Sequence, residues 1–305
     1  RGADVDATAL KQVAVRRLKT DIPEKGFKQR KVKTIPFQPA AEEQEHFAEL
    51  ERLLKESSKR NAIHGGTAGD LVGMLLKKRF LSSPYAFGLT MDLYTRAPAR
   101  GRLPDDLDAY GDEVLWASDE EEGQADHPEL VTLRQSKSSD PLSAASPGEL
   151  ESLAGWGRSY EGRPDARLTA LLTFLDGICR SGKLWTNERV VVFTEYAATL
   201  EWLTTVLESR GYKGRLATIQ GSTLAEERER IRAQFTADPS EEPVRVLLAT
   251  DSAGEGIDLQ THCHRLVNFD IPFNPSRLEQ RIGRIDRYGQ TRTPEVFHLV
   301  PVASS

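Results

Sequence analysis

Arginines near the end of the chain have the types and spacing of an anion-binding site. In the segment "NPSRLEQRIGRIDRYGQ", residues 274–290, apolar residues recur at helical spacing, which predicts a helix over about 275–287. Its apolar stripe consists of Leu278, Ile282 and Ile285. A second stripe with the same spacing consists of Gln280, Arg284 and Arg287. Clustered like charges destabilise a helix, whereas rigid guanidinium forks grip phosphate oxygens. The segment therefore favours a polyanion site over a merely solvated basic helix, and we expect Arg281, off the second stripe, to contribute less.

A glycine-bearing turn upstream is a second candidate for phosphate binding. In "LLATDSAGEGIDLQ", residues 247–260, an apolar strand is expected to end at Thr250. Glycines after a strand let backbone N–H groups approach a phosphate closely. The hydroxyls of Thr250 and Ser252 would add donors, and Asp258 could accept from a ribose hydroxyl. An ordinary strand-to-helix turn is the alternative for this segment alone.

Two other segments imitate binding motifs. "GICRSGKL", residues 177–184, has the glycines and lysine of a phosphate loop, but Leu184 stands where Ser or Thr must hold the metal. It also closes a helix instead of opening one. "HCH", residues 262–264, offers ligands for zinc, but no second ligand pair accompanies it. The sequence therefore predicts no metal site.

The elements that must position these residues alternate between strand and helix after Pro164. Apolar runs of strand length are "RVVVFT", "RLATI", "VRVLLAT", "RLVNFD" and "VFHLV". Between them we expect helices over 168–178, capped by Gly182, over 200–207, closed by Gly211, and from a Thr223/Glu226 capping box to Phe235. Strands that are apolar throughout predict an α/β fold with a parallel sheet covered on both faces. Ligands bind at the carboxyl ends of such strands.

The chain before Pro164 has a different character. Residues 1–91 predict a strand at "VKTIPF", a helix over 40–60 and a second helix stopped by Ser82, Ser83 and Pro84. Residues 92–163 are poor in periodicity, and we expect a long, acidic, partly disordered insertion with a short helix near Leu150. The predicted units are therefore 1–91, 92–163 and 164–305.

Composition limits the function classes. The net charge of −5 conceals an acidic run from Asp105 to Glu129, with 11 acidic residues and no Lys or Arg, beside a basic segment from Lys11 to Lys33. A basic nucleic-acid surface is therefore compatible with the acidic total. No run reaches the roughly 18 apolar residues of a membrane helix. Two cysteines exclude a disulfide scaffold and predict a cytoplasmic protein.

Together these segments resemble the second RecA-like lobe of superfamily-two helicases, and more narrowly the bacterial RapA branch of the Swi/Snf-type DNA-dependent ATPases, which also has relatives in phage defence. Four segments resemble motif IV, the following glycine and arginine motif, motif V and motif VI: "VVVFTEY", "IQGSTLAEERERIRAQF", "LLATDSAGEGIDLQ" and "QRIGRIDRYGQ". Upstream, "VAVRRLKTDIP" and "LLKKRFLSSPYAF" resemble the junction after lobe one and the helical protrusion. The resemblance implies a RecA-like parallel sheet with an N-terminal helical protrusion. It leaves the insertion without a counterpart.

The resemblance also implies roles for individual residues. Arg284 and Arg287 would be the motif VI arginines that act on ATP, with support from Gln280, Gly256 and Asp258 beside the nucleotide. Contacts to the nucleic-acid backbone would come from Thr194, Gly221, Ser222, Thr250 and Ser252. The family's second histidine–arginine step is Asp286–Arg287 here, which favours the bacterial branch.

Motifs I, Ia, II and III, which bind ATP and Mg²⁺ in that family, do not occur in these 305 residues. The chain begins at Arg1, and we expect it to be part of a longer protein whose first lobe holds the nucleotide. The resemblance implies double-stranded DNA and the first lobe as partners, with RNA polymerase or phage-defence proteins according to the pathway. A non-catalytic docking module and an RNA helicase lobe are the alternative interpretations.

Overall fold

A six-stranded parallel sheet forms the centre of the molecule, in the order β1-β8-β7-β4-β6-β5. The computed structural model describes residues 28–62, 68–96, 141–251, 257–272 and 274–302. The strands are β1 (Lys31–Phe37), β4 (Val190–Thr194), β5 (Leu216–Ile219), β6 (Val246–Thr250), β7 (Arg265–Asn268) and β8 (Glu295–Pro301). Each strand runs parallel to its neighbours. The predicted parallel sheet is therefore confirmed.

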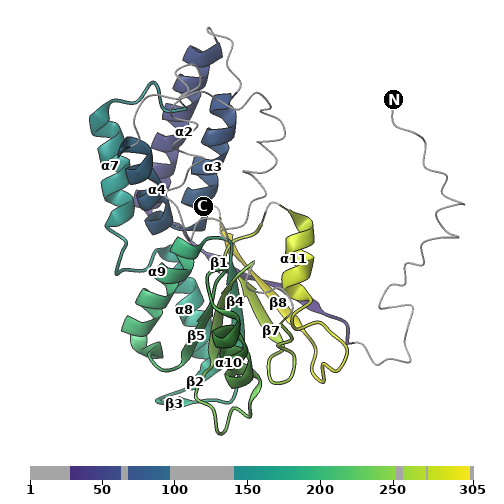
Figure 1. The fold of residues 1–305 in the computed structure, drawn as a ribbon. Helices are drawn as coiled ribbons and strands as arrows, with labels where there is room; N and C mark the ends of the chain where they lie inside the picture. Colours follow the sequence, from purple (N-terminus) through teal and green to yellow (C-terminus); the bar gives the residue numbers. More distant parts are fainter. Residues whose placement is uncertain (1–27, 63–67, 97–140, 252–256, 273, 303–305) are drawn as a thin grey trace, which may run out of the picture.

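Helices cover both faces of the sheet, as the uniformly apolar strands require (Figure 1). Val190 and Val192 of β4 pack in one core with α8 (Ala166–Cys179) and α9 (Ala197–Leu207). Val191 and Phe193 point to the other face, where they pack in a core with α10 (Ala225–Thr236) and α11 (Pro275–Ile282). Successive strand residues alternate between faces, so a strand buried on both sides has to be apolar at every position.

The edge strand β1 comes from far away in the sequence. It pairs in parallel with β8, with Lys31 opposite Glu295 and Phe37 opposite Pro301. Pro36 is tolerated because an edge strand has one side without a ladder partner. Residues 31–37 thus complete the sheet of the C-terminal lobe, so the predicted unit 1–91 is not structurally separate from 164–305.

Beyond one end of the sheet, helices of the described residues form a layer (Figure 1). They are α2 (Ala41–Ala62), α3 (Ala68–Ser82), α4 (Pro84–Arg96) and α7 (Pro147–Arg158), and we call them the helical layer. They share a core of their own, built around Leu50, Phe80, Phe87 and Trp156. This layer confirms the predicted helical protrusion.

The helix expected near Leu150 is present as α7, but it is not part of a solvated insertion. Ser146 and Glu149 form a capping box at its start, and Leu153 and Trp156 are buried against α4 and its neighbours. Residues 141–163 therefore pack with the helical layer, because the few apolar side chains of this segment share one helical face. The acidic run from Asp105 to Glu129 lies outside the described residues.

Three local expectations were wrong in detail. Pro84 begins α4 instead of only stopping α3, as its fixed φ suits a first helical turn. Thr223 does not cap α10, whose N-cap is Leu224, because its hydroxyl accepts from the backbone N–H of Gln220. Gly182, with φ 61°, lies in the turn between the short strands β2 (Arg180–Ser181) and β3 (Leu184–Trp185), and Arg180 caps α8. Gly211, with φ 93°, closes the helix of α9 as predicted.

Two glycines allow α4 and α7 to cross at backbone contact. A Cβ on Gly157 would lie 2.5 Å from the Cα of Gly88, and a Cβ on Gly88 would lie 2.6 Å from the backbone nitrogen of Arg158. Such distances leave no room for any side chain. Gly155, two residues earlier on α7, meets only the Arg158 side chain, at 3.7 Å.

We predict that Gly157→Ala lowers the free energy of unfolding by about 1–3 kcal/mol, the usual cost of overpacking. The matched variant Gly155→Ala should be neutral or stabilising by up to about 1 kcal/mol, since alanine restricts the unfolded chain more than glycine. Urea unfolding of both variants checks this. Equal stability of the two variants would contradict the close crossing.

Candidate functional site

The carboxyl ends of neighbouring strands gather the polar side chains of the motif segments at one edge of the sheet. Strand β4 ends at Thr194 and continues into Glu195, and β6 ends at Thr250 and continues into Asp251. Strand β7, on the other side of β4, leads from Asn268 into Asp270. Parallel strands place their carboxyl ends together, so residues up to 76 positions apart become neighbours.

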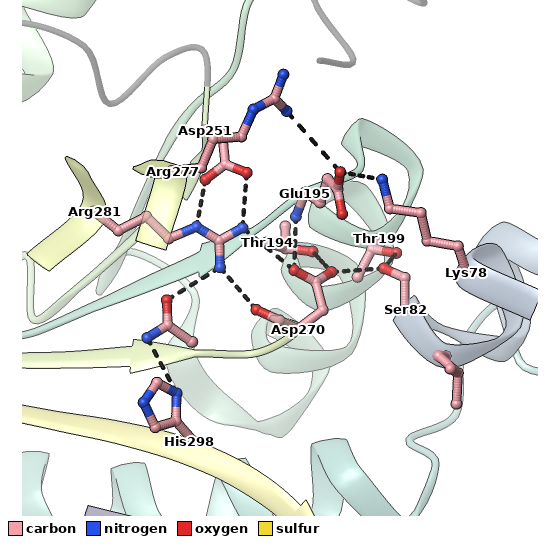
Figure 2. A network of polar contacts seen from close by, with 12 residues as sticks. Lys78, Ser82, Thr194, Glu195, Thr199, Asp251, Asp270, Arg277, Arg281 and His298 are labelled. Atoms are coloured by element: carbon pink, nitrogen blue, oxygen red, sulfur yellow. Dashed lines mark hydrogen bonds and ion pairs between the residues drawn. The ribbon is translucent and has the colours of Figure 1, made fainter. Parts of the chain in front are cut away.

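Asp270 is a shared acceptor at this edge (Figure 2). Its Oδ2 accepts from the hydroxyl of Thr194 at 2.6 Å and from that of Ser82 at 2.7 Å. Its Oδ1 accepts from the backbone N–H of Glu195 at 2.9 Å. The carboxylate is 9% exposed, and hydrogen bonds from several donors stabilise its charge in that setting.

Arg281 of α11 is buried at the centre of the same cluster, with 2% of its surface exposed. It makes a two-pronged ion pair with Asp251, with Nη2 at 2.9 Å from Oδ2. Its Nη1 donates to Asn268 Oδ1 at 3.1 Å and to the Asp270 carbonyl at 2.7 Å. Burial opposes the charge, but Asp251 and Asp270 outweigh it and raise the pKa of Arg281.

Arg281 therefore has a structural role that the sequence analysis did not foresee, and the expectation that it contributes less to a polyanion site stays a prediction. Its position one residue before Ile282 and three after Leu278 places it beside the apolar stripe, which is the signal that sequence reasoning missed. A buried arginine needs acidic partners. Asp251 and Asp270 follow two apolar strands, so the sequence contained those partners as well.

Helix α11 ends at Ile282, five residues before the predicted end. Gly283 caps it, and residues 283–289 continue as turns stabilised by short-range backbone bonds such as Asp286 N–H to Ile282 O at 2.9 Å. Gln280, Arg284 and Arg287 therefore do not form one helical stripe. Gln280 is exposed on the helix, Arg284 is half-buried in the turn, and Arg287 is exposed.

The turn is held against the segment that follows the glycine-rich stretch. The backbone N–H of Leu259 donates to the Arg284 carbonyl at 3.0 Å. Gln290, which sequence reasoning did not select, is buried and donates to the carbonyls of Cys263 and Ile285 at 3.0 Å each. These bonds fix the backbone path of residues 283–290. They therefore fix the backbone positions from which the side chains of Arg284 and Arg287 extend.

Arg287 forms an ion pair with Asp258, which brings together two residues that the sequence assigned to the nucleotide. Their side chains are 43% and 52% exposed. An ion pair this exposed contributes about 0–1 kcal/mol, so exchanging the carboxylate for another anion costs little. Arg281 is thus locked inside the protein, whereas Arg287 is available to a ligand.

The residues predicted to contact nucleic acid differ in exposure. Gly221 is half-buried and Ser222 is exposed, on the turn that follows β5. Thr194 and Thr250 are 1% exposed, and the Thr194 hydroxyl is donated to Asp270, so in this conformation Thr194 organises the edge. Ser252 and Gly256 lie outside the described residues.

The two imitations of binding motifs are structural elements. Gly182 and Lys183 of the phosphate-loop imitation form a hairpin turn between β2 and β3. In "HCH", burial raises the pKa of the Cys263 thiol to about 11 and, with help from Arg265, lowers that of His264 to about 4.

Within the described ranges, no group of three or more His, Cys, Asp or Glu side chains could hold a metal ion. Nor is any helix described there long and apolar enough to cross a membrane.

A cavity of ≈ 190 Å³ borders the cluster, lined among others by Lys78, Ser82, Glu195 and Asp270. Ligand pockets usually have about 300–1,000 Å³. This cavity is therefore too small to enclose a nucleotide. The described edge could form only one wall of a nucleotide site.

Comparison with known proteins finds similarity to helicases. Residues 169–289 match the helicase conserved C-terminal domain. The chain is 37% identical over 113 residues to an uncharacterized ATP-dependent helicase, YqhH, of Bacillus subtilis, a match that covers 37% of this chain and 19% of that protein. It is 43% identical over 115 residues to the RNA polymerase-associated protein RapA of Yersinia enterocolitica, covering 38% of this chain and 11% of that protein. The matched part thus spans less than a fifth of either relative.

A solved structure extends the likeness in fold to the helical layer. The C-terminal part of the Fun30 ATPase domain superimposes with a TM-score of 0.53 over 90% of this chain and 86% of that one, at 17% identity. This similarity confirms the RecA-like fold class.

We predict that Arg281→Ala lowers the free energy of unfolding by about 3–5 kcal/mol, because it leaves Asp251 and Asp270 buried without their cation. Arg287→Ala should cost less than about 1 kcal/mol, since its ion pair is exposed. Chemical unfolding of both variants, followed by circular dichroism, measures the difference. A small effect at Arg281 would contradict its place as the buried centre of the cluster.

Proposed function

Starting from residues 169–289, which form a helicase C-terminal domain on a RecA-like sheet, we propose that the chain is the second motor lobe of an ATP-dependent double-stranded DNA translocase or remodelling ATPase. In this role Arg284 and Arg287 act on the phosphates of an ATP that another lobe holds. Gln280, Gly256 and Asp258 support that site. ATP and its Mg²⁺ would be held mainly by the first lobe, and no residue of this chain is proposed as a metal ligand.

The observation that carries the proposal is the exposed Arg287–Asp258 pair on a turn fixed to the rest of the site. An arginine that stabilises phosphoryl transfer has to be positioned in advance yet free to exchange its partner. The fixed turn holds Arg287 in position. Because its ion pair with Asp258 is weak and solvated, Arg287 can exchange that carboxylate for a phosphate. Arg281 cannot have this role, because its Nη1 and Nη2 groups already donate to the Asp270 carbonyl and to Asp251 inside the protein.

The missing part of the site supports a role as one half of a motor. The cavity at the edge is too small for a nucleotide, and the lobe-one motifs that would grip the phosphates do not occur in these residues. A second lobe closing over this edge would bring the nucleotide to Arg284 and Arg287. This lobe therefore binds, orients and stabilises charge, but it does not hydrolyse ATP by itself.

For the DNA track we propose the turn after β5, with Gly221 and Ser222, together with Thr250 and Ser252 after β6. Thr194 would support the track from beneath, through Asp270. Hydroxyls and backbone N–H groups reach phosphates and not base edges, so the contacts would not depend on base sequence.

We propose a cytoplasmic location, in keeping with the two free, buried cysteines. The likeness to an RNA polymerase-associated protein makes RNA polymerase a partner to test, alongside phage-defence proteins.

We predict that the chain alone releases no phosphate from ATP, whereas the longer protein with its first lobe is a DNA-stimulated ATPase. In that protein Arg287→Ala should lower the turnover by about 10²–10⁵-fold with DNA binding nearly intact, because the arginine acts on charge that develops in the transition state. Arg287→Lys should rescue poorly, since lysine lacks the planar fork. Steady-state phosphate release at saturating DNA measures this.

The matched control is Arg292→Ala, an exposed arginine paired with Glu188 at the opposite, amino end of β4. It should leave the turnover unchanged. If Arg287→Ala kept near-normal turnover, the arginine assignment would be wrong. If the longer protein hydrolysed no ATP with any nucleic acid, the docking-module interpretation would replace the motor.

We also predict weak, sequence-independent DNA binding whose affinity falls steeply with salt, because each phosphate contact releases counterions. Ser222→Glu should weaken binding of the chain to duplex DNA by roughly three- to tenfold, by placing a like charge beside phosphate. Ser240→Glu, on an exposed turn at the amino edge of the sheet, is the control and should have no effect. Fluorescence anisotropy at two salt concentrations, with duplexes of two sequences and a matched RNA, tests this. Tighter binding of RNA would favour an RNA helicase lobe.

A further inference from the structure

The boundary between the helical layer and the sheet is polar and buried. Lys78 of α3 forms an ion pair with Glu195 after β4, and the two side chains are 6% and 4% exposed. Burial raises the pKa of Glu195, and Lys78 opposes that shift. Ser82 and Ser83 both lie against the Thr199 hydroxyl in α9, at 2.8 and 2.9 Å. Apolar surfaces can slide over one another, but a buried polar cluster has few arrangements that satisfy all its groups.

Asp270 joins this boundary to the edge of the sheet where the parallel strands end (Figure 2). The carboxylate accepts from Ser82 of the helical layer and Thr194 of β4, and its Oδ1 lies 3.4 Å from Arg281 Nη2 of α11. Both oxygens are in use, so a movement of α3 that pulls Ser82 away leaves Asp270 with one strong donor fewer. Such a buried carboxylate has to reorient or lose stability.

Arg281 carries the connection from Asp270 to the arginines of the turn. Its Nη1 donates to the Asp270 carbonyl at 2.7 Å, so the guanidinium is fixed to the backbone and the side chain of one residue. Arg284 follows three residues later, and its carbonyl accepts from the Leu259 N–H. The path from Ser82 to the turn of Arg284 and Arg287 therefore consists of hydrogen bonds and one short stretch of chain.

We propose that Ser82 is a positioning residue for ATP hydrolysis: through Asp270 and Arg281 it ties the helical layer to the turn that presents Arg284 and Arg287. The ATPase part of this inference rests on the proposed motor function. Any contact that displaces the helical layer then changes where these arginines lie, and nucleotide binding changes the layer in return, since such coupling is reciprocal.

The first experiment uses the 305-residue chain and needs no ATPase. Unfolding equilibrium constants are measured for Ser82→Ala, Arg281→Lys and the double variant. Because the two side chains share Asp270 without touching, we expect their effects to be non-additive by about threefold or more in the unfolding constant. If Arg281→Lys does not fold, Asp270→Asn takes its place in the cycle.

The matched control is Ser57→Ala. Ser57 is also a buried serine of the helical layer, but its hydroxyl accepts from the backbone N–H of Ala144. The effects of Ser57→Ala and Arg281→Lys on the unfolding constant should multiply, that is, their free energies should add. Additive behaviour of Ser82 and Arg281 would overturn the connection through Asp270.

The second experiment measures steady-state ATPase kinetics in the longer, two-lobed protein. Ser82→Ala should lower kcat by about threefold or more with KM for ATP unchanged, because misplaced arginines fail in the transition state and not in substrate binding. Ser57→Ala should leave kcat as it is, even where both variants lose the same thermal stability. Equal kcat values for the two variants would overturn the positioning role.

The two experiments separate this inference from the proposed function. A wild-type protein without ATPase activity would refute the motor, while the stability cycle would still decide the connection from Ser82 to Arg281. An active wild-type protein with additive stability effects would retain the motor and refute the inference.

Discussion

The edge where the parallel strands end depends on the buried guanidinium of Arg281. Two carboxylates and an amide from the ends of strands β6 and β7 surround it, with Asp251 in a two-pronged ion pair. A charge this deep is tolerated only when every donor has a partner. The burial therefore fixes several elements at once: the ends of two strands, the axis of α11 and, through Asp270, the carboxyl end of β4.

Apolar contacts stabilise each layer of the molecule, and polar contacts lie between the helical layer and the sheet. Two apolar cores cover the two faces of the sheet, and a third lies inside the helical layer. Polar groups mark the boundary where the helical layer meets the sheet, with Lys78–Glu195 and the serines near Thr199 among them. Apolar burial supplies most of the folding free energy. The polar boundary adds a defined relative orientation, because hydrogen bonds are directional.

Exposure increases along residues 281–287, and this gradient separates a buried, structural arginine from an exposed one. Arg281 is buried, Arg284 is half-buried and Arg287 is exposed, all within seven residues. The end of α11 at Gly283 produces the gradient, because the chain leaves the helix and turns toward solvent. In the proposed motor, a site that receives phosphates from another lobe would use both kinds of arginine. The buried one holds α11, and under that proposal the exposed one would exchange its weak partner, Asp258, for the nucleotide.

The sequence by itself determined the parallel sheet, most of the helices to within a few residues, and the helicase-like order of the motif segments, but it did not predict α4. Periodicity and buried strands are local properties, so they could be read without coordinates. Tertiary structure alone decided the pairing of β1 with β8, the packing of α7 through Gly88 and Gly157, the early end of α11, and the burial of Arg281. Each of these depends on residues far apart in the chain. The position of Arg281 beside the apolar stripe is a local signal of partial burial, but it does not show which groups surround the guanidinium, and only the fold brings Asp251 and Asp270 to its side.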